Sequence, residues 1–102
     1  MVKHIILWKL KDELQGEELE RVKDGIKENL EGLKGQIPGL LEIRVNKTGL
    51  PSSKEADLML DSTFESVDAL KGYSVHPAHV AVANTFVRPY TAHRSCFDFE
   101  TD

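Results

Sequence analysis

The order of strand-like and helix-like segments in this sequence predicts an α+β fold, with helices on one face of an antiparallel sheet. Residues 2–10 are rich in β-branched and aromatic residues and contain neither Gly nor Pro, which is typical of a strand. From about residue 17, apolar residues recur every three and four positions, which indicates a helix. Further strand-like segments and a second helical region follow, and they give the order βαββαβ. This is the split βαβ pattern of a ferredoxin-like sandwich with a four-stranded antiparallel sheet.

Length and composition limit the organisation and the partners of the chain. The 102 residues suit a single domain over residues 1–102 with one modest core. A net charge of −4 with scattered Lys and Arg argues against nucleic acid and against an anionic membrane as partners. No apolar run has membrane-spanning length, and no secretory signal is recognisable. Cys96 is the only cysteine, so we expect a packed strand residue in a cytoplasmic protein.

The first strand predicts how both faces of the sheet are covered. One of its faces carries Val2, His4, Ile6, Trp8 and Leu10. The other carries Lys3, Ile5, Leu7 and Lys9. Because both faces are apolar in the middle, we expect helices to cover one and a second copy of the chain to cover the other. The predicted assembly is a two-fold homodimer through the open sheet face, with a barrel-like interior.

The first helix and the second strand follow from simple periodicities. The apolar stripe of the helix is Leu19, Val22, Ile26, Leu30 and Leu33. Gly25 and Gly32 each weaken the helix by about 1 kcal/mol relative to Ala, so packing on the sheet must stabilise it. The Ile37–Gly39 sequence, with its central proline, ends it. Leu41, Ile43 and Val45 then alternate with polar residues as a second strand with one wet face.

Two more strands are expected in the second half of the chain. Residues 48–55 are rich in Gly, Pro and Ser and form a loop. Residues 56–64 are a plausible third strand, with a lower strand propensity because of two aspartates. Residues 94–100 alternate as the last strand. One of its sides carries Cys96, Asp98 and Glu100, and the other carries Ser95, Phe97 and Phe99.

Helical segments connect the third and the last strand. Ser66 is a suitable N-cap for a short helix that reaches Tyr73. Pro77 favours the first turn of a further helix, which we expect to continue until Pro89. His76, directly before Pro77, is expected to cap or precede this helix rather than to react.

Tyr73, His79 and His4 are the candidate reactive residues. Helical spacing places His79 on one side with Val82, Ala83 and Phe86. His4 shares its strand face with Ile6 and Trp8, so both imidazoles should point inward. An imidazole in a partly dry pocket can take a proton, and a nearby phenol can orient it or bind an oxyanion. Each of the three could instead be structural. The two histidines would then be buried side chains satisfied by hydrogen bonds, and Tyr73 would be a helix-end aromatic residue whose hydroxyl reaches water.

Five segments together resemble one known family. They are Val2–Lys11, Ile37–Gly39, Thr63–Ser66, His76–His79 and Phe97–Phe99, and they are similar to the stress-responsive dimeric α/β-barrel (Dabb) family over essentially the whole chain. The resemblance implies a dimeric ferredoxin-like barrel. It leaves the activity open, because some members are stress-induced proteins of unknown activity and a plant member closes a polyketide chain by aldol condensation.

The resemblance to that plant cyclase also suggests roles for individual residues. Tyr73 and His79 match its catalytic pair, and His4 matches its first-strand histidine. The expected lining of the ligand pocket is Ile6, Trp8, Val22, Ile26, Val80 and Phe86. Val22 and Ile26 stand where the cyclase has aromatic residues, and Trp8 replaces a smaller aliphatic residue. The cavity should therefore differ in shape, and the polyketide substrate is not carried over.

Several functions remain open at this point. The first is a homodimer that holds a small hydrophobic or carbonyl-containing molecule in a pocket between sheet and helices. The alternative is a cofactor-independent lyase or cyclase with His79 as general base and Tyr73 as orienting or oxyanion group. A third is the cofactor-free monooxygenase activity of other ferredoxin-like barrels. We expect no cofactor and no metal, because no histidine spacing resembles a zinc signature, and we expect His93 and Arg94 to be solvated.

Overall fold

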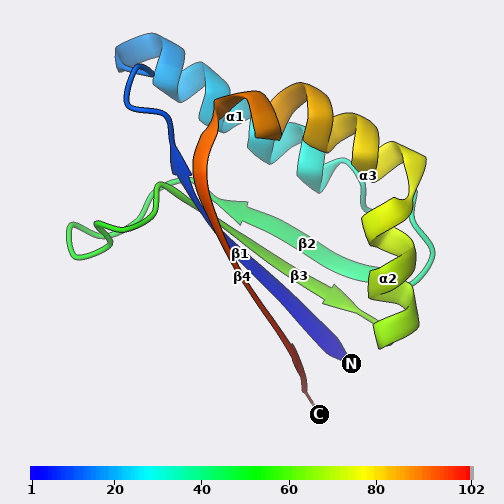
Figure 1. Ribbon diagram of the computed structural model, residues 1–102. Coiled ribbons are helices and arrows are strands. Elements are labelled where there is room, and N and C mark those ends of the chain that lie inside the picture. The colour runs from blue at the N-terminus through cyan, green and yellow to red at the C-terminus, as the bar shows by residue number, and fades with distance from the viewer. Residues whose placement is uncertain (102) are drawn as a thin grey trace.

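The computed structural model describes residues 1–101. Its elements, in chain order, are β1 (Val2–Leu10), α1 (Gly16–Glu31), β2 (Leu40–Asn46), β3 (Leu58–Phe64), α2 (Val67–Val75), α3 (Pro77–Val82), the π-helical η1 (Ala83–Val87), the 3₁₀-helical η2 (Arg88–Tyr90) and β4 (Thr91–Glu100). Figure 1 shows the helices together on one face of the sheet. The predicted ferredoxin-like α+β fold is confirmed.

The sheet has the strand order β2-β3-β1-β4, and all neighbours are antiparallel. In the register of β1, His4 lies opposite Ser62 on β3 and Asp98 on β4. Side chains of residues that lie opposite each other point to the same face of a sheet. This register therefore gathers polar side chains from three strands on the helix-covered face.

One core lies between the sheet and α1. The buried side chains of α1 are Ile26 and Leu30, and Leu33 in the following turn is also buried. They pack on the inner face of the sheet, whose buried apolar residues are Val2, Ile6, Trp8, Leu10, Leu40, Ile43, Val45, Leu58, Leu60 and Phe64. The predicted apolar stripe is thus the contact surface, and burial of these residues supplies the main stabilisation of the fold.

The turn before β2 requires a glycine. Gly39 has a φ of 81°, a backbone conformation that side chains disfavour. A Cβ atom at this position would lie 2.5 Å from the Cβ of Ala69 on α2. The Gly39 carbonyl also accepts a hydrogen bond of 2.9 Å from the Glu65 N–H. The turn therefore fixes the distance between β2 and the start of α2.

Two details of the strands differ from the sequence prediction. The pairing of β2 with β3 shifts register between Leu40 and Glu42, so Leu40 is buried and Leu41 is exposed. Simple alternation had assigned Leu41 to the core. Cys96 is exposed in the single chain rather than packed, because β4 is an edge strand whose residues after Thr91 are all exposed.

The region after Pro77 is less regular than predicted. A single helix was expected to end at Pro89, but α3 passes into a π-helical turn and Pro89 lies inside η2. A π-helical turn holds more residues than an α-helical turn, so it changes which side chains face the sheet. Val87 is consequently buried, whereas Phe86 is 36% exposed.

The opposite face of the sheet has no covering element within residues 1–101 (Figure 1). Its apolar side chains include Leu7 on β1 and Phe97 and Phe99 on β4, and all three are exposed. The two phenylalanine rings lie 5.7 Å apart. None of the helices in residues 1–101 combines the length and the apolar character needed to span a membrane.

Candidate functional site

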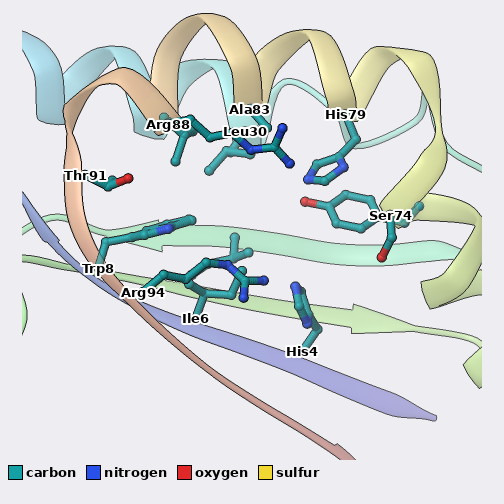
Figure 2. A pocket seen from close by; sticks show the side chains of 13 residues that line it. His4, Ile6, Trp8, Leu30, Ser74, His79, Ala83, Arg88, Thr91 and Arg94 are labelled. Atoms are coloured by element: carbon teal, nitrogen blue, oxygen red, sulfur yellow. The ribbon is translucent and has the colours of Figure 1, made fainter.

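A cavity of about 360 Å³ lies between the inner face of the sheet and the helices that follow β3. This volume is at the small end of the range for ligand pockets. The lining residues are His4, Ile6, Trp8, Leu30, Leu60, Tyr73, Ser74, His79, Ala83, Val87, Arg88, Thr91 and Arg94. In Figure 2, His79 descends from the helical layer and His4 rises from β1, so the two imidazoles approach the cavity from opposite walls.

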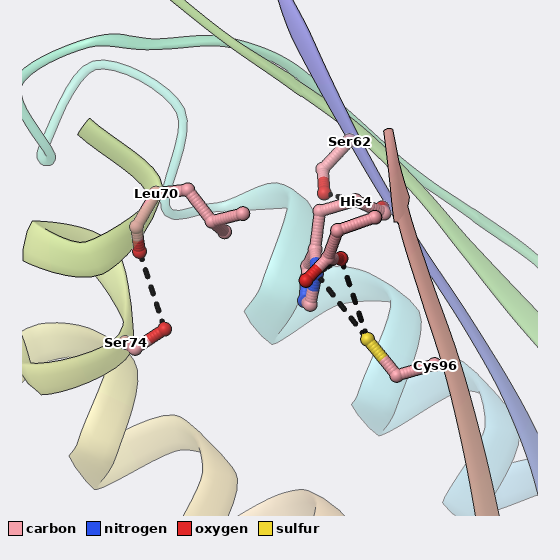
Figure 3. Close-up of polar contacts among 6 residues, drawn as sticks. His4, Ser62, Leu70, Ser74 and Cys96 are labelled. Carbon is pink, nitrogen blue, oxygen red and sulfur yellow. Dashed lines mark hydrogen bonds and ion pairs between the residues drawn. The ribbon is translucent and has the colours of Figure 1, made fainter. Parts of the chain in front are cut away.

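The sheet holds His4 in one orientation. The Nδ1 of His4 lies 2.5 Å from Oδ1 of Asp98, directly across on β4. His4 is only 6% exposed, and Asp98 is its main polar contact. Because an ionised carboxylate accepts a hydrogen bond, Asp98 selects the tautomer of His4 with the proton on Nδ1. The buried Ser62 hydroxyl donates a 2.8 Å hydrogen bond to the His4 carbonyl (Figure 3). The Nε2 atom of His4 remains available for a ligand.

The junction of α2 and α3 places Tyr73 against His79. Ser66 caps α2, its hydroxyl accepting from the Ala69 N–H at 3.1 Å. His76 caps α3, its Nδ1 accepting from the Ala78 N–H at 3.1 Å, as expected for a residue before Pro77. The chain therefore bends at His76, and the rings of Tyr73 and His79 stack with centroids 4.1 Å apart.

Two polar atoms of this stacked pair, the Tyr73 hydroxyl and Nδ1 of His79, are buried without a hydrogen bond of normal geometry within residues 1–101. The Ser74 backbone nevertheless lies close enough to the His79 ring to influence its pKa, so the Tyr73 hydroxyl is the clearer case. Buried polar atoms are otherwise almost always hydrogen-bonded, since an unsatisfied one costs about 1–3 kcal/mol. A polar ligand group in this cavity would satisfy the Tyr73 hydroxyl.

Burial also sets the protonation states of the pair. It raises the pKa of the Tyr73 phenol far above its usual value, with a smaller opposing influence from Arg94. It lowers the pKa of the His79 imidazole, an effect that the Ser74 backbone partly offsets and that Arg88, His4 and Arg94 reinforce. At neutral pH the site therefore presents a neutral phenol that can donate and a neutral imidazole that can accept a proton.

The structure brings together five of the nine residues expected at the site. His4, Ile6, Trp8, Tyr73 and His79 all line the cavity. Val22, Ile26, Val80 and Phe86 do not. Ile26 is fully buried in the core instead, and α1 contributes Leu30, one turn further along. The π-helical turn replaces Phe86 by Val87, and Phe86 lies beside Gly25 of α1.

Arg88 and Arg94 are lining residues that were not predicted. Arg94 is exposed, as expected at the entrance of the last strand, but it also lines the cavity, because it lies opposite Trp8 in the register and points to the same face. The alternation along β4 could have predicted this position, because Arg94 lies on the same side of the strand as Cys96 and Asp98. Arg88 had no such signal, since its position depends on η1 and η2.

One group of side chains has the donor types of a metal site. Donor atoms of His4, Cys96 and Asp98 lie within 4.8 Å of one another (Figure 3). Cys96 Sγ is 3.6 Å from His4 Nδ1 and 3.3 Å from Asp98 Oδ1. A tetrahedral zinc ion would hold its nitrogen and oxygen ligands about 3.3 Å apart, so the 2.5 Å contact of His4 with Asp98 would have to open. Spacing along the sequence could not show this group, which forms only across two strands.

Comparisons with known proteins were consistent with one another. The profile of the "Stress responsive A/B Barrel Domain" (Dabb) family matches residues 2–101. Olivetolic acid cyclase of Cannabis sativa is 31% identical over 87 residues, which are 83% of this chain and 82% of that protein. An uncharacterized protein of Streptomyces coelicolor is 37% identical over 83 residues, which are 79% of this chain and 81% of that protein.

A solved structure is similar over nearly the full length. It is a dimeric protein of unknown function with a ferredoxin-like fold from Bacteroides fragilis. Its TM-score is 0.89 and its sequence identity is 34%, and the match covers 98% of this chain and 95% of that chain. The family resemblance seen in the sequence is confirmed by these matches.

Proposed function

The chain belongs to the stress-responsive A/B barrel (Dabb) family, and from this premise we propose that it is a cytoplasmic homodimer that binds a small carbonyl-containing molecule in the cavity. The observation that carries the proposal is the buried Tyr73 hydroxyl, which has no hydrogen-bond partner within residues 1–101. A carbonyl oxygen accepts a hydrogen bond from the phenol, so such a ligand removes the cost of leaving it unsatisfied.

The rest of the lining fits the hydrocarbon part of such a molecule. Ile6, Trp8, Leu60 and Val87 give the cavity an apolar wall. Ligand pockets typically combine such a wall with a few polar groups that fix orientation. The volume of about 360 Å³ limits the ligand to a small molecule.

A simple ketone tests the binding function. Titration with 2-heptanone labelled with ¹³C at the carbonyl should shift the indole N–H signal of Trp8, the only tryptophan. The carbonyl ¹³C signal should move in the direction that hydrogen bonding causes. Tyr73→Phe should abolish the carbonyl shift, whereas the matched Tyr90→Phe, outside the cavity lining, should preserve it. Absence of any saturable change would refute the proposal.

A second candidate is a cofactor-independent lyase or cyclase, and the neutral His79 beside Tyr73 favours it. In the first step the unprotonated nitrogen of His79 takes a proton from the carbon next to the carbonyl. The C–H electrons form the enolate, whose oxygen accepts the Tyr73 hydrogen bond. The enolate carbon then attacks a second carbonyl of the same molecule, and the new alkoxide takes the proton back. His4, fixed by Asp98, positions the substrate.

The reaction can be followed on a surrogate β-polyketone. With 2,4,6-heptanetrione, ring closure by aldol condensation and loss of water gives a dihydroxytoluene, which is measured by chromatography. His79→Ala should abolish product formation and leave the melting temperature nearly unchanged. An equal loss of folding would identify a core histidine, and unchanged turnover would exclude His79 as the base.

The homodimer forms through the open face of the sheet. Leu7, Phe97 and Phe99 are exposed there, and a monomer with such a surface would present apolar side chains to water. The similar protein from Bacteroides fragilis is itself dimeric. Packing of two such faces in a two-fold arrangement buries both sets at once.

Sedimentation velocity tests the assembly. The wild type should sediment as a dimer at micromolar concentration, and Phe97→Glu should shift it to a monomer. Val75→Glu is the matched control, because Val75 is 76% exposed on α2, away from the open face. A well-folded wild-type monomer would contradict this assembly.

A further inference from the structure

The lining of the cavity includes two exposed arginines, and we propose that they select a ligand with a carboxylate, so that the molecule bound is a keto acid. This inference rests on the proposed function, since the carbonyl group of the same molecule lies deeper, at Tyr73 and His79. The arginines are Arg88, at the start of η2, and Arg94, on β4.

The two arginines reach the cavity from different layers of the fold. Figure 2 shows Arg88 in the helical layer and Arg94 on the sheet side, with both side chains directed into the space between the layers. Both residues are exposed, whereas Tyr73 in the same lining is buried. A molecule in the cavity can therefore place a charged end at the solvent-exposed guanidinium groups and another polar group at the buried phenol.

Their positive charge is not neutralised by an ion pair. Seven ion pairs are present within residues 1–101, and neither Arg88 nor Arg94 takes part in any of them. Arg88 donates to the neutral Asn84 side chain at 2.5 Å. Asp98 lies near Arg94 but forms its ion pair with His4 and not with the guanidinium group.

The charge of the cavity is opposite to that of the chain. The sequence has 17 acidic and 13 basic residues, yet the lining contains two arginines, two histidines and no carboxylate. Charges in a concave site with low-dielectric walls attract ions of opposite sign. A guanidinium group also matches a carboxylate in shape, because it can donate two parallel hydrogen bonds.

The arrangement assigns each part of the ligand to a part of the cavity. The carboxylate lies at the arginines, the hydrocarbon chain along Trp8 and Ile6, and the carbonyl oxygen at the Tyr73 hydroxyl. The unpartnered buried hydroxyl is thus an observation independent of the arginines that points to a ligand in the same cavity.

Three matched ligands distinguish the contribution of the carboxylate to binding from that of the carbonyl group. They are 6-oxoheptanoate, its methyl ester and 2-heptanone, titrated into the full chain while the Trp8 indole N–H signal is followed by NMR. The keto acid should bind at least tenfold more tightly than the ester, and added KCl should reduce this preference. The ester and 2-heptanone should bind with similar affinity.

Variants then assign the preference to the arginines. Arg88→Gln and Arg94→Gln should each remove most of the preference for the acid and leave the affinity for the ester unchanged. Arg21→Gln, on the exposed surface of α1, should change neither affinity. Arg94→Lys keeps a charge and should retain part of the preference, and circular dichroism checks the fold of every variant.

The outcomes distinguish this inference from the proposed function. Equal binding of acid and ester would overturn the carboxylate site and leave the carbonyl site standing. Tighter binding of the acid that survives both glutamine variants would also overturn the role of the arginines. Failure of all three ligands to bind would refute both proposals.

Discussion

The two parts of the helical layer differ in regularity and in what they contribute. The first, α1, is one unbroken helix of 16 residues whose buried side chains complete the core. The second covers residues 67–90 and consists of α2, α3, a π-helical turn and a 3₁₀ turn. This second part supplies Tyr73, His79 and Arg88 to the cavity, whereas α1 supplies only Leu30.

The difference shows that the regular helix mainly stabilises the fold, whereas the irregular segment mainly forms the candidate site. A regular helix packs a continuous apolar stripe and leaves few polar atoms unsatisfied. The broken segment leaves the Tyr73 hydroxyl buried without a hydrogen-bond partner in the described part of the chain. Such local costs are typical of functional sites, and the rest of the fold must offset them.

Two single-residue deletions should give the largest contrast. Deletion of Asn29 rotates Leu30 and Leu33 away from the sheet, so we expect a loss of about 4 kcal/mol or more in the free energy of unfolding. Deletion of Thr85 converts the π-helical turn into an α-helical one and keeps His79, Ala83 and Val87 on one side. We therefore expect it to lower the free energy of unfolding by only about 1 kcal/mol. Urea denaturation measures both. Equal losses would show that the second part is as constrained as the first.

A core substitution should have the next largest effect. Ile26 is completely buried, so Ile26→Ala should lower the free energy of unfolding by about 3 kcal/mol. Val22→Ala, at a partly buried position of the same helix, is the control and should cost about 1 kcal/mol. If the two substitutions cost the same, the stripe of α1 does not pack on the sheet as described.

Removal of the unpartnered Tyr73 hydroxyl should stabilise the folded chain and weaken ligand binding in the cavity. Tyr73→Phe eliminates a buried donor without a partner and should raise the free energy of unfolding by about 1 kcal/mol. Tyr90→Phe changes a partly buried tyrosine outside the cavity and should have little effect. A destabilised Tyr73→Phe would mean that the hydroxyl is satisfied in the free protein.

The pH dependence linked to His79 should be the smallest effect. Burial lowers the pKa of His79 from its ordinary value of 6.5, so the unfolded chain binds more protons than the folded chain just below that pH. The stability contribution of neutral His79 is therefore complete above pH 6.5 and decreases as the pH falls toward the lowered pKa. His79→Gln should make the loss of stability between pH 7.5 and pH 5.5 smaller, and an identical loss would contradict the lowered pKa.

How far the sequence predicts each part depends on the range of the interactions involved. The fold class, the stripe of α1 and the caps at Ser66 and His76 follow from local periodicity and capping chemistry, and the structure agrees with them. The expected pocket was less accurate, because Phe86 was placed by assuming a regular helix. Leu41 was misplaced for the same kind of reason, since alternation does not anticipate a register shift.

The amino-acid sequence by itself determined the order of the elements and the inward direction of His4, Ile6 and Trp8, because alternation along a strand is a local property. Only the tertiary structure decided which distant residues meet. The contact of His4 with Asp98, the stacking of Tyr73 on His79 and the presence of Arg88 and Arg94 in one cavity lining depend on strand register, on the bend at His76 and on the π-helical turn. These features arise when whole elements pack together, and no short window of sequence contains the forces that set them.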